Sequence, residues 1–181
     1  MKKLLITAVA ALLSASLAHA QDVPKADISA GVSDLYIIKG LTINMTGASG
    51  AVAVNANNWL GLVGDFGVYF GHVGPSITAE TYTFGPRVSL RKPGARFVPF
   101  AQGLFGGSHF SIDTSGISGG GSEFTFGLGG GGDILLGSGG KFALRGQFEY
   151  FGIRAFGSTT NTVRFGAGIV YRIGKKSVSG R

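Results

Sequence analysis

Apolar and polar residues alternate with a period of two along most of this chain. Between residues 161 and 173, Phe165, Ile169 and Tyr171 share one face, and Arg164 and Arg172 share the other. Successive side chains of a β-strand point to opposite faces, so this alternation indicates strands. The same apolar face recurs upstream at Leu62, Phe66, Phe70, Tyr82, Phe84, Phe124, Phe126, Leu128, Phe142, Leu144, Phe148 and Tyr150.

The alternation predicts eight strands. Five of them are strongly patterned, whereas the first two and the fifth have a weaker alternation. The expected ranges are 26–35, 45–55, 58–71, 80–91, 96–108, 122–136, 141–153 and 161–173.

Short and long connections alternate between these strands. Residues 55–58, 92–95 and 137–140 are short and rich in Asn, Pro and Gly, which favour turns. The links expected at 36–44, 72–79, 109–121 and 154–160 are longer. An even number of antiparallel strands with short turns at one end and longer loops at the other is typical of membrane barrels. The predicted fold is therefore all-β, an eight-stranded antiparallel up-and-down transmembrane β-barrel.

The first 20 residues have the features of a secretory signal peptide. Lys2 and Lys3 precede an apolar run, and Ala18-His19-Ala20 is a small-x-small cleavage site. The expected organisation is a cleaved signal peptide over 1–20, a barrel over 21–173 and a basic tail over 174–181.

Composition excludes several other classes of protein. Only 14% of the 181 residues are charged, 44% are hydrophobic, and there is no cysteine. A disordered chain needs more charge, and disulfide scaffolds and thiolate zinc sites need cysteine. The 33 glycines interrupt the apolar runs that a helical membrane bundle would require. Without Lys2 and Lys3 the net charge of +7 falls to +5, which is mild for a nucleic-acid-binding protein, so no nucleic-acid partner is expected for an exported chain.

The orientation of the two faces separates a membrane barrel from a soluble one. The less apolar face carries mostly small residues, with five acidic and five basic side chains that can balance one another. Charges that leave water must be paired, so we expect this face to line a narrow interior and the aromatic face to contact lipid. The predicted interior ion-pair network contains Asp65, Arg87, Asp133, Arg145, Glu149 and Arg164.

Two specific ion pairs follow from the strand order. Asp133 and Arg145 lie across the turn at 137–140, and Glu149 and Arg164 lie across the link at 154–160. A register shifted by one residue would move all of these side chains to the opposite face.

Two prolines fall inside predicted strands. Pro86 and Pro99 lie on either side of the turn at 92–95 and are expected nearly opposite each other. Proline cannot donate to the ladder, so a bulge or a missing ladder bond is expected there.

The chain resembles the small outer-membrane β-barrel proteins, a group that includes the OmpA-like and OmpX-like barrels. The resemblance rests on Phe84-Gly85-Pro86-Arg87, on Pro99-Phe100-Ala101 followed by Leu104-Phe105-Gly106-Gly107, and on the glycine run that ends at Asp133. The last strand also resembles the signal read by the barrel-assembly machinery. That signal is matched by Arg164, Gly166, Ile169 and Tyr171. The resemblance implies the bacterial outer membrane as location, outer-membrane lipid and the barrel-assembly machinery as partners, and a monomer.

Candidate chemistry is sparse. Gly127 to Gly132 matches a G-x-G-x-x-G motif by letters, but a strand pattern follows where a helix is needed. His109 and Ser111 resemble the pair of lipid A deacylases, with Asp113 or Glu123 as a possible acid, but Ile112 stands where that motif has Asn. We therefore predict no catalytic residue, no metal site and no cofactor, and we identify no partner for the outer loops.

Four functions remain open at this point. The first is a barrel with a structural or surface-interaction role, its lumen plugged by charged side chains, since eight strands leave room only for side chains. The alternatives are a narrow porin-like channel, a soluble periplasmic ligand-binding barrel and, more remotely, a lipid A deacylase-like enzyme.

Overall fold

The computed structural model describes residues 22–39, 41–72, 76–92, 94–114, 117–137, 140–155, 158–174 and 176–177. The expected signal peptide at 1–20 and most of the tail at 174–181 lie outside these residues. Eight of the described strands form a closed antiparallel barrel in which each strand pairs with its neighbours in sequence and the last pairs with the first. They are β2 (Ala26–Lys39), β3 (Leu41–Asn55), β4 (Leu60–His72), β5 (Ser76–Ser89), β6 (Phe97–Thr114), β7 (Ile117–Leu136), β8 (Phe142–Ala155) and β9 (Ser158–Ile173).

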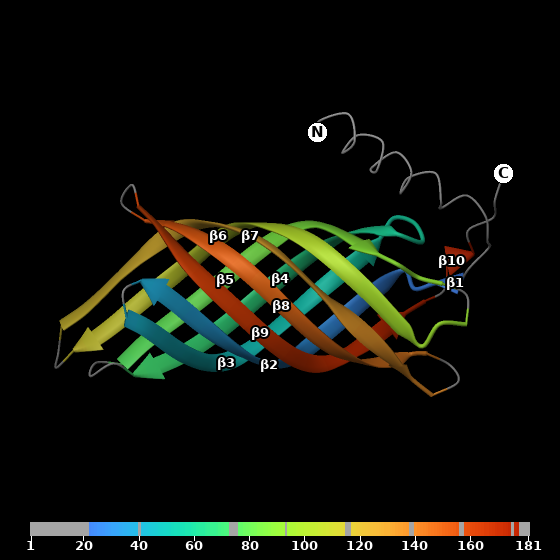
Figure 1. Ribbon diagram of the computed structural model, residues 1–181, viewed down its shortest axis with the longest axis horizontal. Coiled ribbons are helices and arrows are strands. Elements are labelled where there is room, and N and C mark those ends of the chain that lie inside the picture. Colours follow the sequence, from blue (N-terminus) through green and yellow to red (C-terminus); the bar gives the residue numbers. More distant parts are fainter. Residues whose placement is uncertain are drawn as a thin grey trace, which may run out of the picture.

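The predicted up-and-down barrel is therefore confirmed, and each expected strand overlaps an observed one (Figure 1). Two further strands, β1 (Asp22–Val23) and β10 (Lys176–Ser177), pair with each other at the end of the barrel where β2 begins and β9 ends (Figure 1). We call this the proximal end and the opposite one the distal end. The expected boundaries at 21–173 and 174–181 miss this second sheet, because two-residue strands carry too few side chains to show a period.

The expectation of four long distal links is wrong. The strands continue through most of these segments, and Tyr36 pairs with Asn44 where a loop of 36–44 was expected. The strands keep their in-and-out order there, but apolar side chains now face inward and several polar ones face outward. Ile37, Ile43 and Ile77 are packed on the inside of the distal end, whereas Asn44 and Thr46 are exposed on its outside.

The aromatic and aliphatic side chains of the apolar face point outward and form a belt around the barrel, which we call the aromatic belt. Phe66, Phe84 and Phe105 are 53%, 59% and 45% exposed, so the expected register is correct for every strongly patterned strand. A soluble barrel would place such side chains inside. The belt thus has the apolar exterior that a lipid bilayer requires.

One of the two prolines interrupts the ladder, as expected, but the other does not. Pairing of β5 with β6 stops after Phe84↔Phe105 and resumes at Arg87↔Gln102 in the same register, so Pro86 causes a gap without a bulge. The two prolines are not opposite each other. Leu90 lies opposite Pro99 instead, and Leu90 N donates to Pro99 O at 2.9 Å. Since β6 begins at Phe97, Pro99 is only the third residue of its strand.

Candidate functional site: the closed lumen

The middle of the lumen is occupied by an ionic layer centred on Arg164. Nε of Arg164 donates to Glu149 Oε2 at 2.9 Å, and Nη1 donates to Asp65 Oδ1 at 2.7 Å. The side chains of Arg164 and Glu149 have no exposed surface, and that of Asp65 is 2% exposed. Buried ion pairs persist only when their geometry is good and their remaining polar atoms are bonded. Two carboxylates on one guanidinium provide that geometry, whereas Nη2 of Arg164 has no hydrogen-bond partner within the described residues and the guanidinium lies 5.2 Å from the centre of the Phe151 ring.

A glutamine extends the ionic layer toward Arg87. Nε2 of Gln102 donates to Glu149 Oε1 at 3.0 Å, and Oε1 of Gln102 accepts from Arg87 Nε at 2.8 Å. Nη1 and Nη2 of Arg87 have no hydrogen-bond partner within the described residues. Instead the guanidinium lies 4.6 Å from the centre of the Phe100 ring, which it contacts as a cation–π pair.

Arg145 and Asp133 form a second buried ion pair, in bidentate geometry. Nε and Nη2 of Arg145 donate to the two carboxylate oxygens of Asp133 at 2.7 and 2.9 Å. The Arg145 guanidinium also lies 4.8 Å from the centre of the Phe100 ring. Paired N–H donors on one carboxylate fix both side chains, so this pair stabilises the β7–β8 hairpin from inside.

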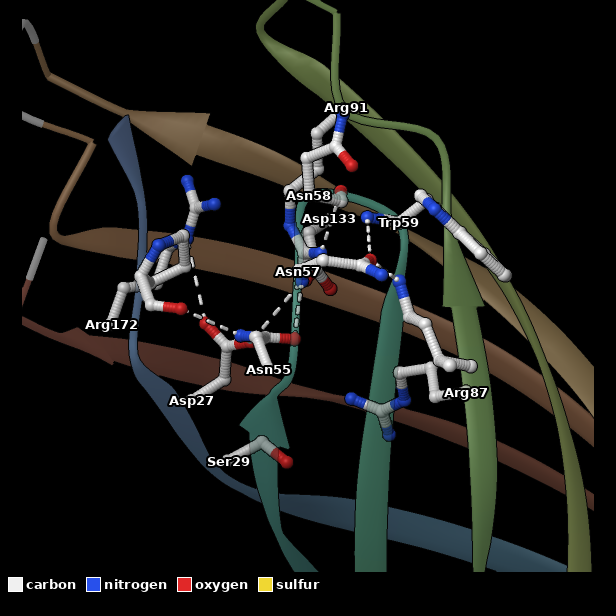
Figure 2. Close-up of polar contacts among 12 residues, drawn as sticks. Asp27, Ser29, Asn55, Asn57, Asn58, Trp59, Arg87, Arg91, Asp133 and Arg172 are labelled. Atoms are coloured by element: carbon white, nitrogen blue, oxygen red, sulfur yellow. Dashed lines mark hydrogen bonds and ion pairs between the residues drawn. The ribbon is translucent and has the colours of Figure 1, made fainter. Parts of the chain in front are cut away.

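Polar side chains also close the proximal end of the lumen (Figure 2). Asp27 lies 3.6 Å from Arg91 and 3.5 Å from Arg172, measured between side-chain nitrogen and oxygen atoms. Nδ2 of Asn55 donates to Asp27 Oδ2 at 3.0 Å and to Pro24 O at 2.9 Å. Burial lowers the pKa of the Arg91 guanidinium, and the nearby Asp27 carboxylate opposes that change. The cluster ties the chain before β2 to the turns at this end.

The distal end of the lumen is filled by apolar side chains. Leu35, Met45, Tyr69 and Ala79 are fully buried, and Ile37, Ile43, Ile77 and Phe110 pack against them. A separate interior cavity of about 20 Å³ lies beside Ser29, Ser49, Asp65, Arg145 and Gln147, which is room for a single water molecule. Within the described residues, the lumen therefore holds an apolar cluster, which we call the apolar plug, above the ionic layer.

The structure brings together most of the expected network. Both predicted cross-strand pairs, Asp133–Arg145 and Glu149–Arg164, are present, and Asp65 joins the second. Arg87 is buried at the expected place and joins the network through Gln102, but it forms no ion pair within the described residues. The other arginines already bind the nearby carboxylates, and only the amide of Gln102 is left for it.

Sequence reasoning missed Gln102 and Tyr69, which both complete the network. Nη1 of Arg164 donates to the Tyr69 hydroxyl at 3.0 Å. Gln102 faces inward between Phe100 and Leu104, and that inward-facing polar residue on an apolar stretch was an available signal.

The residues of the expected assembly signal lie on both faces of β9. Arg164 is buried and Gly166 is partly buried, whereas Ile169 and Tyr171 are 58% and 44% exposed toward the lipid side. Recognition by the assembly machinery stays a prediction.

His109 and Ser111 do not form the pair that a deacylase-like site would need. Nδ1 of His109 lies 3.0 Å from the hydroxyl of Ser122 on β7. No ion pair with His109 is found within the described residues, and no group of three potential metal ligands is found there either.

In the same residues, no helix is long and apolar enough to span a membrane.

The fold is that of the small eight-stranded outer-membrane β-barrels, as comparison with solved structures shows. Neisserial surface protein A has a TM-score of 0.71 at 11% identity, covering 82% of this chain and 97% of its own. Ail, the attachment invasion locus protein of Yersinia pestis, has a TM-score of 0.59 at 18% identity, covering 82% of this chain and 99% of its own. The N-terminal β-barrel domain of Pseudomonas aeruginosa OprF has a TM-score of 0.53 at 13% identity, covering 83% and 100%. No protein-family model and no curated protein sequence matches the chain.

Proposed function

We propose that this chain is a bacterial outer-membrane protein with a closed lumen that presents its distal end to the cell exterior as a rigid surface platform. The observation that carries the proposal is the presence of two buried layers of side chains in the lumen. An ionic layer around Arg164 lies below an apolar plug around Leu35 and Met45, and both are buried. Side chains that fill an eight-stranded barrel leave a packed interior and no pore.

The reversed polarity of the distal end supports the role of a surface platform. Above the aromatic belt, the exterior carries the exposed polar residues Asn44, Thr46 and Arg154 together with the apolar Ile38, while the interior is apolar, and a mostly polar exterior over an apolar interior is the pattern of a barrel wall in water. Thr46 Oγ1 donates to Asp34 Oδ1 at 2.6 Å on this exterior, and the Tyr150 hydroxyl donates to Asn161 Oδ1 at 2.7 Å. The strands thus extend past the lipid belt into solvent, where a partner on another surface can reach them.

The expected partners of the barrel follow from the same arrangement of side chains. The apolar belt takes outer-membrane lipid as its solvent, and the closed ladder needs no second copy to complete it, which supports a monomer. Insertion depends on the barrel-assembly machinery. We propose no catalytic activity and no cofactor for this chain.

Cysteine labelling on intact cells tests the location and orientation. The chain has no cysteine, so Ser122→Cys at the distal end and Lys92→Cys at the proximal end each provide one thiol. A membrane-impermeant maleimide should label the first variant in intact cells and the second only after the cells are opened. Labelling of neither variant until the outer membrane is opened would place the protein in the periplasm and contradict the proposal.

Planar-bilayer recording separates the platform from the narrow porin-like channel. The purified protein is first shown to be folded by its shift on unboiled SDS gels, and is then added to the bilayer. We expect no stable ohmic steps, because both layers of the lumen are closed. Reproducible steps that scale with the amount of folded protein would favour the channel.

A further inference from the structure

Four exposed cations surround the proximal end of the barrel. Lys25 precedes β2, Lys92 and Arg96 belong to the link between β5 and β6, and Lys141 precedes β8. We call these four residues the basic collar. No ion pair involves any of them within the described part of the chain.

The charges at the two ends of the barrel are unequal. At the proximal end, the carboxylates of Asp27 and Asp133 are buried and held by arginines inside the lumen. They leave the collar uncompensated. At the distal exterior, the partly buried Asp34 and Glu80 accompany the exposed Arg154. Among the side chains that the structure describes, exposed positive charge is therefore concentrated at the proximal end.

The collar lies directly at the edge of the lipid-facing belt. Arg96 immediately precedes Phe97, which is 54% exposed, and Lys141 immediately precedes Phe142, which is 50% exposed. One residue of strand advances the chain by about 3.3 Å, so Arg96 and Lys141 are one step beyond the apolar belt. That position is the depth of lipid headgroups. Long cationic side chains reach such headgroups while their stems remain on apolar surface.

We propose that the basic collar binds the phosphate groups of anionic phospholipids in the leaflet at the proximal end. The inference rests on the proposed membrane location. Continuity of the collar with the belt favours a lipid over a soluble anion or a periplasmic polymer, because the cations and the apolar side chains contact one molecule together. Basic residues near a membrane surface each contribute attraction to anionic lipid of a size that is readily measured.

Trp59 provides a local reporter for this site. It is the one tryptophan of the chain, and its carbonyl accepts a hydrogen bond of 2.7 Å from Ser89 N, three residues before Lys92. Arg91, next to Lys92, donates to Asn58 O at 3.1 Å. The indole of Trp59 points away from the polar cluster around Asp27 and Asn55 (Figure 2). Quenching of Trp59 by brominated lipids thus reports which lipid lies beside the collar.

The experiment compares brominated phosphatidylglycerol with brominated phosphatidylcholine in vesicles that contain the folded full chain. We expect Trp59 to prefer phosphatidylglycerol by about fivefold at low salt, and the preference to fall toward one at high salt. The preference should also disappear in the combined variant Lys25→Gln, Lys92→Gln, Arg96→Gln and Lys141→Gln. Arg154→Gln removes an exposed cation at the distal end and is the matched control, which should keep the preference.

The outcomes separate this inference from the proposed function. Equal quenching by both lipids in a folded, inserted protein overturns the lipid site and leaves the membrane location intact. No quenching by either lipid overturns the membrane location itself. Binding of isolated peptidoglycan that is lost in the fourfold variant, without any lipid preference, would assign the collar to the cell wall and overturn the inference.

Discussion

The hydroxyl of Tyr69 accepts a hydrogen bond of 3.0 Å from Nη1 of Arg164, ninety-five residues away along the chain. The ring of Tyr69 belongs to the distal apolar plug, whereas Arg164 is the centre of the ionic layer. One side chain therefore joins the apolar plug to the ionic layer.

Replacing Tyr69 with phenylalanine should weaken this junction without opening it. The free energy of unfolding should fall by about 1–1.5 kcal/mol, since Nη1 of Arg164 keeps its bond to Asp65. Urea unfolding from lipid vesicles measures the change. Tyr36→Phe is the control, because Tyr36 faces outward and packs edge-on against Phe165. Equal effects of the two substitutions would argue against a special role for the Tyr69 hydroxyl.

Arg164→Met should be among the most damaging single substitutions in the lumen. It leaves Glu149 and Asp65 buried without their cation, and breaking a buried pair in this way costs about 3–5 kcal/mol. The loss would appear as a lower urea midpoint and as a lower temperature for the gel shift. Adding Glu149→Gln to Arg164→Met should recover part of the stability, because one uncompensated carboxylate is removed. No recovery in the double variant would contradict the assigned pairing.

Arg87→Met should be much milder. Arg87 is buried, its two terminal amino groups have no hydrogen-bond partner in the described structure, and no carboxylate is paired with it. The substitution loses the bond to Gln102 Oε1 but also removes a buried charge without an anionic partner, so stability should fall by about 1 kcal/mol or not at all. The same urea titration measures it. A loss comparable to that of Arg164→Met would show that Arg87 has an anionic partner in the membrane.

Closure of the barrel between its first and last strands depends on two facing glycines. Gly31 on β2 pairs with Gly168 on β9, and a Cβ on Gly31 would overlap the backbone at Ala167 O and Gly168 Cα. Gly31→Ala should therefore destabilise the barrel by about 1–3 kcal/mol. It should also reduce the fraction of protein that shifts in mobility on unboiled SDS gels. Gly146→Ala on β8 is the matched control, because its Cβ meets no atom within 4 Å. Equal yields of folded protein would refute the close approach at this seam.

The sequence predicted the strands and the faces well within the lipid belt, because the alternation there is strong and keeps one phase. It failed at the distal end for a physical reason. Leu35 and Met45 turn inward and Asp34 and Thr46 turn outward, which reverses the polarity expected of a membrane wall. An analysis that looks for an apolar outward face therefore predicts loops at these distal segments, although the strands continue through most of them.

The candidate site was predictable only where chain neighbours form it. Asp133 and Arg145 lie on adjacent strands across a turn, so their pairing follows from register alone. Asp65 and Arg164 lie on β4 and β9, which are not adjacent, and their contact depends on how narrow the lumen is. Whether Arg87 would pair depended in turn on how the other arginines divided the carboxylates among themselves.

The reversal of polarity along the barrel has a mechanical consequence. A barrel that slid outward along the membrane normal would bring buried ion pairs no nearer to water, but it would expose the aromatic belt. A barrel that slid inward would press Asp34 and Glu80 into hydrocarbon, which strongly resists charge. Both displacements raise the free energy, so the order of apolar and polar side chains along the wall sets the depth of the barrel in the bilayer. The same order sets how far the distal end extends above the lipid.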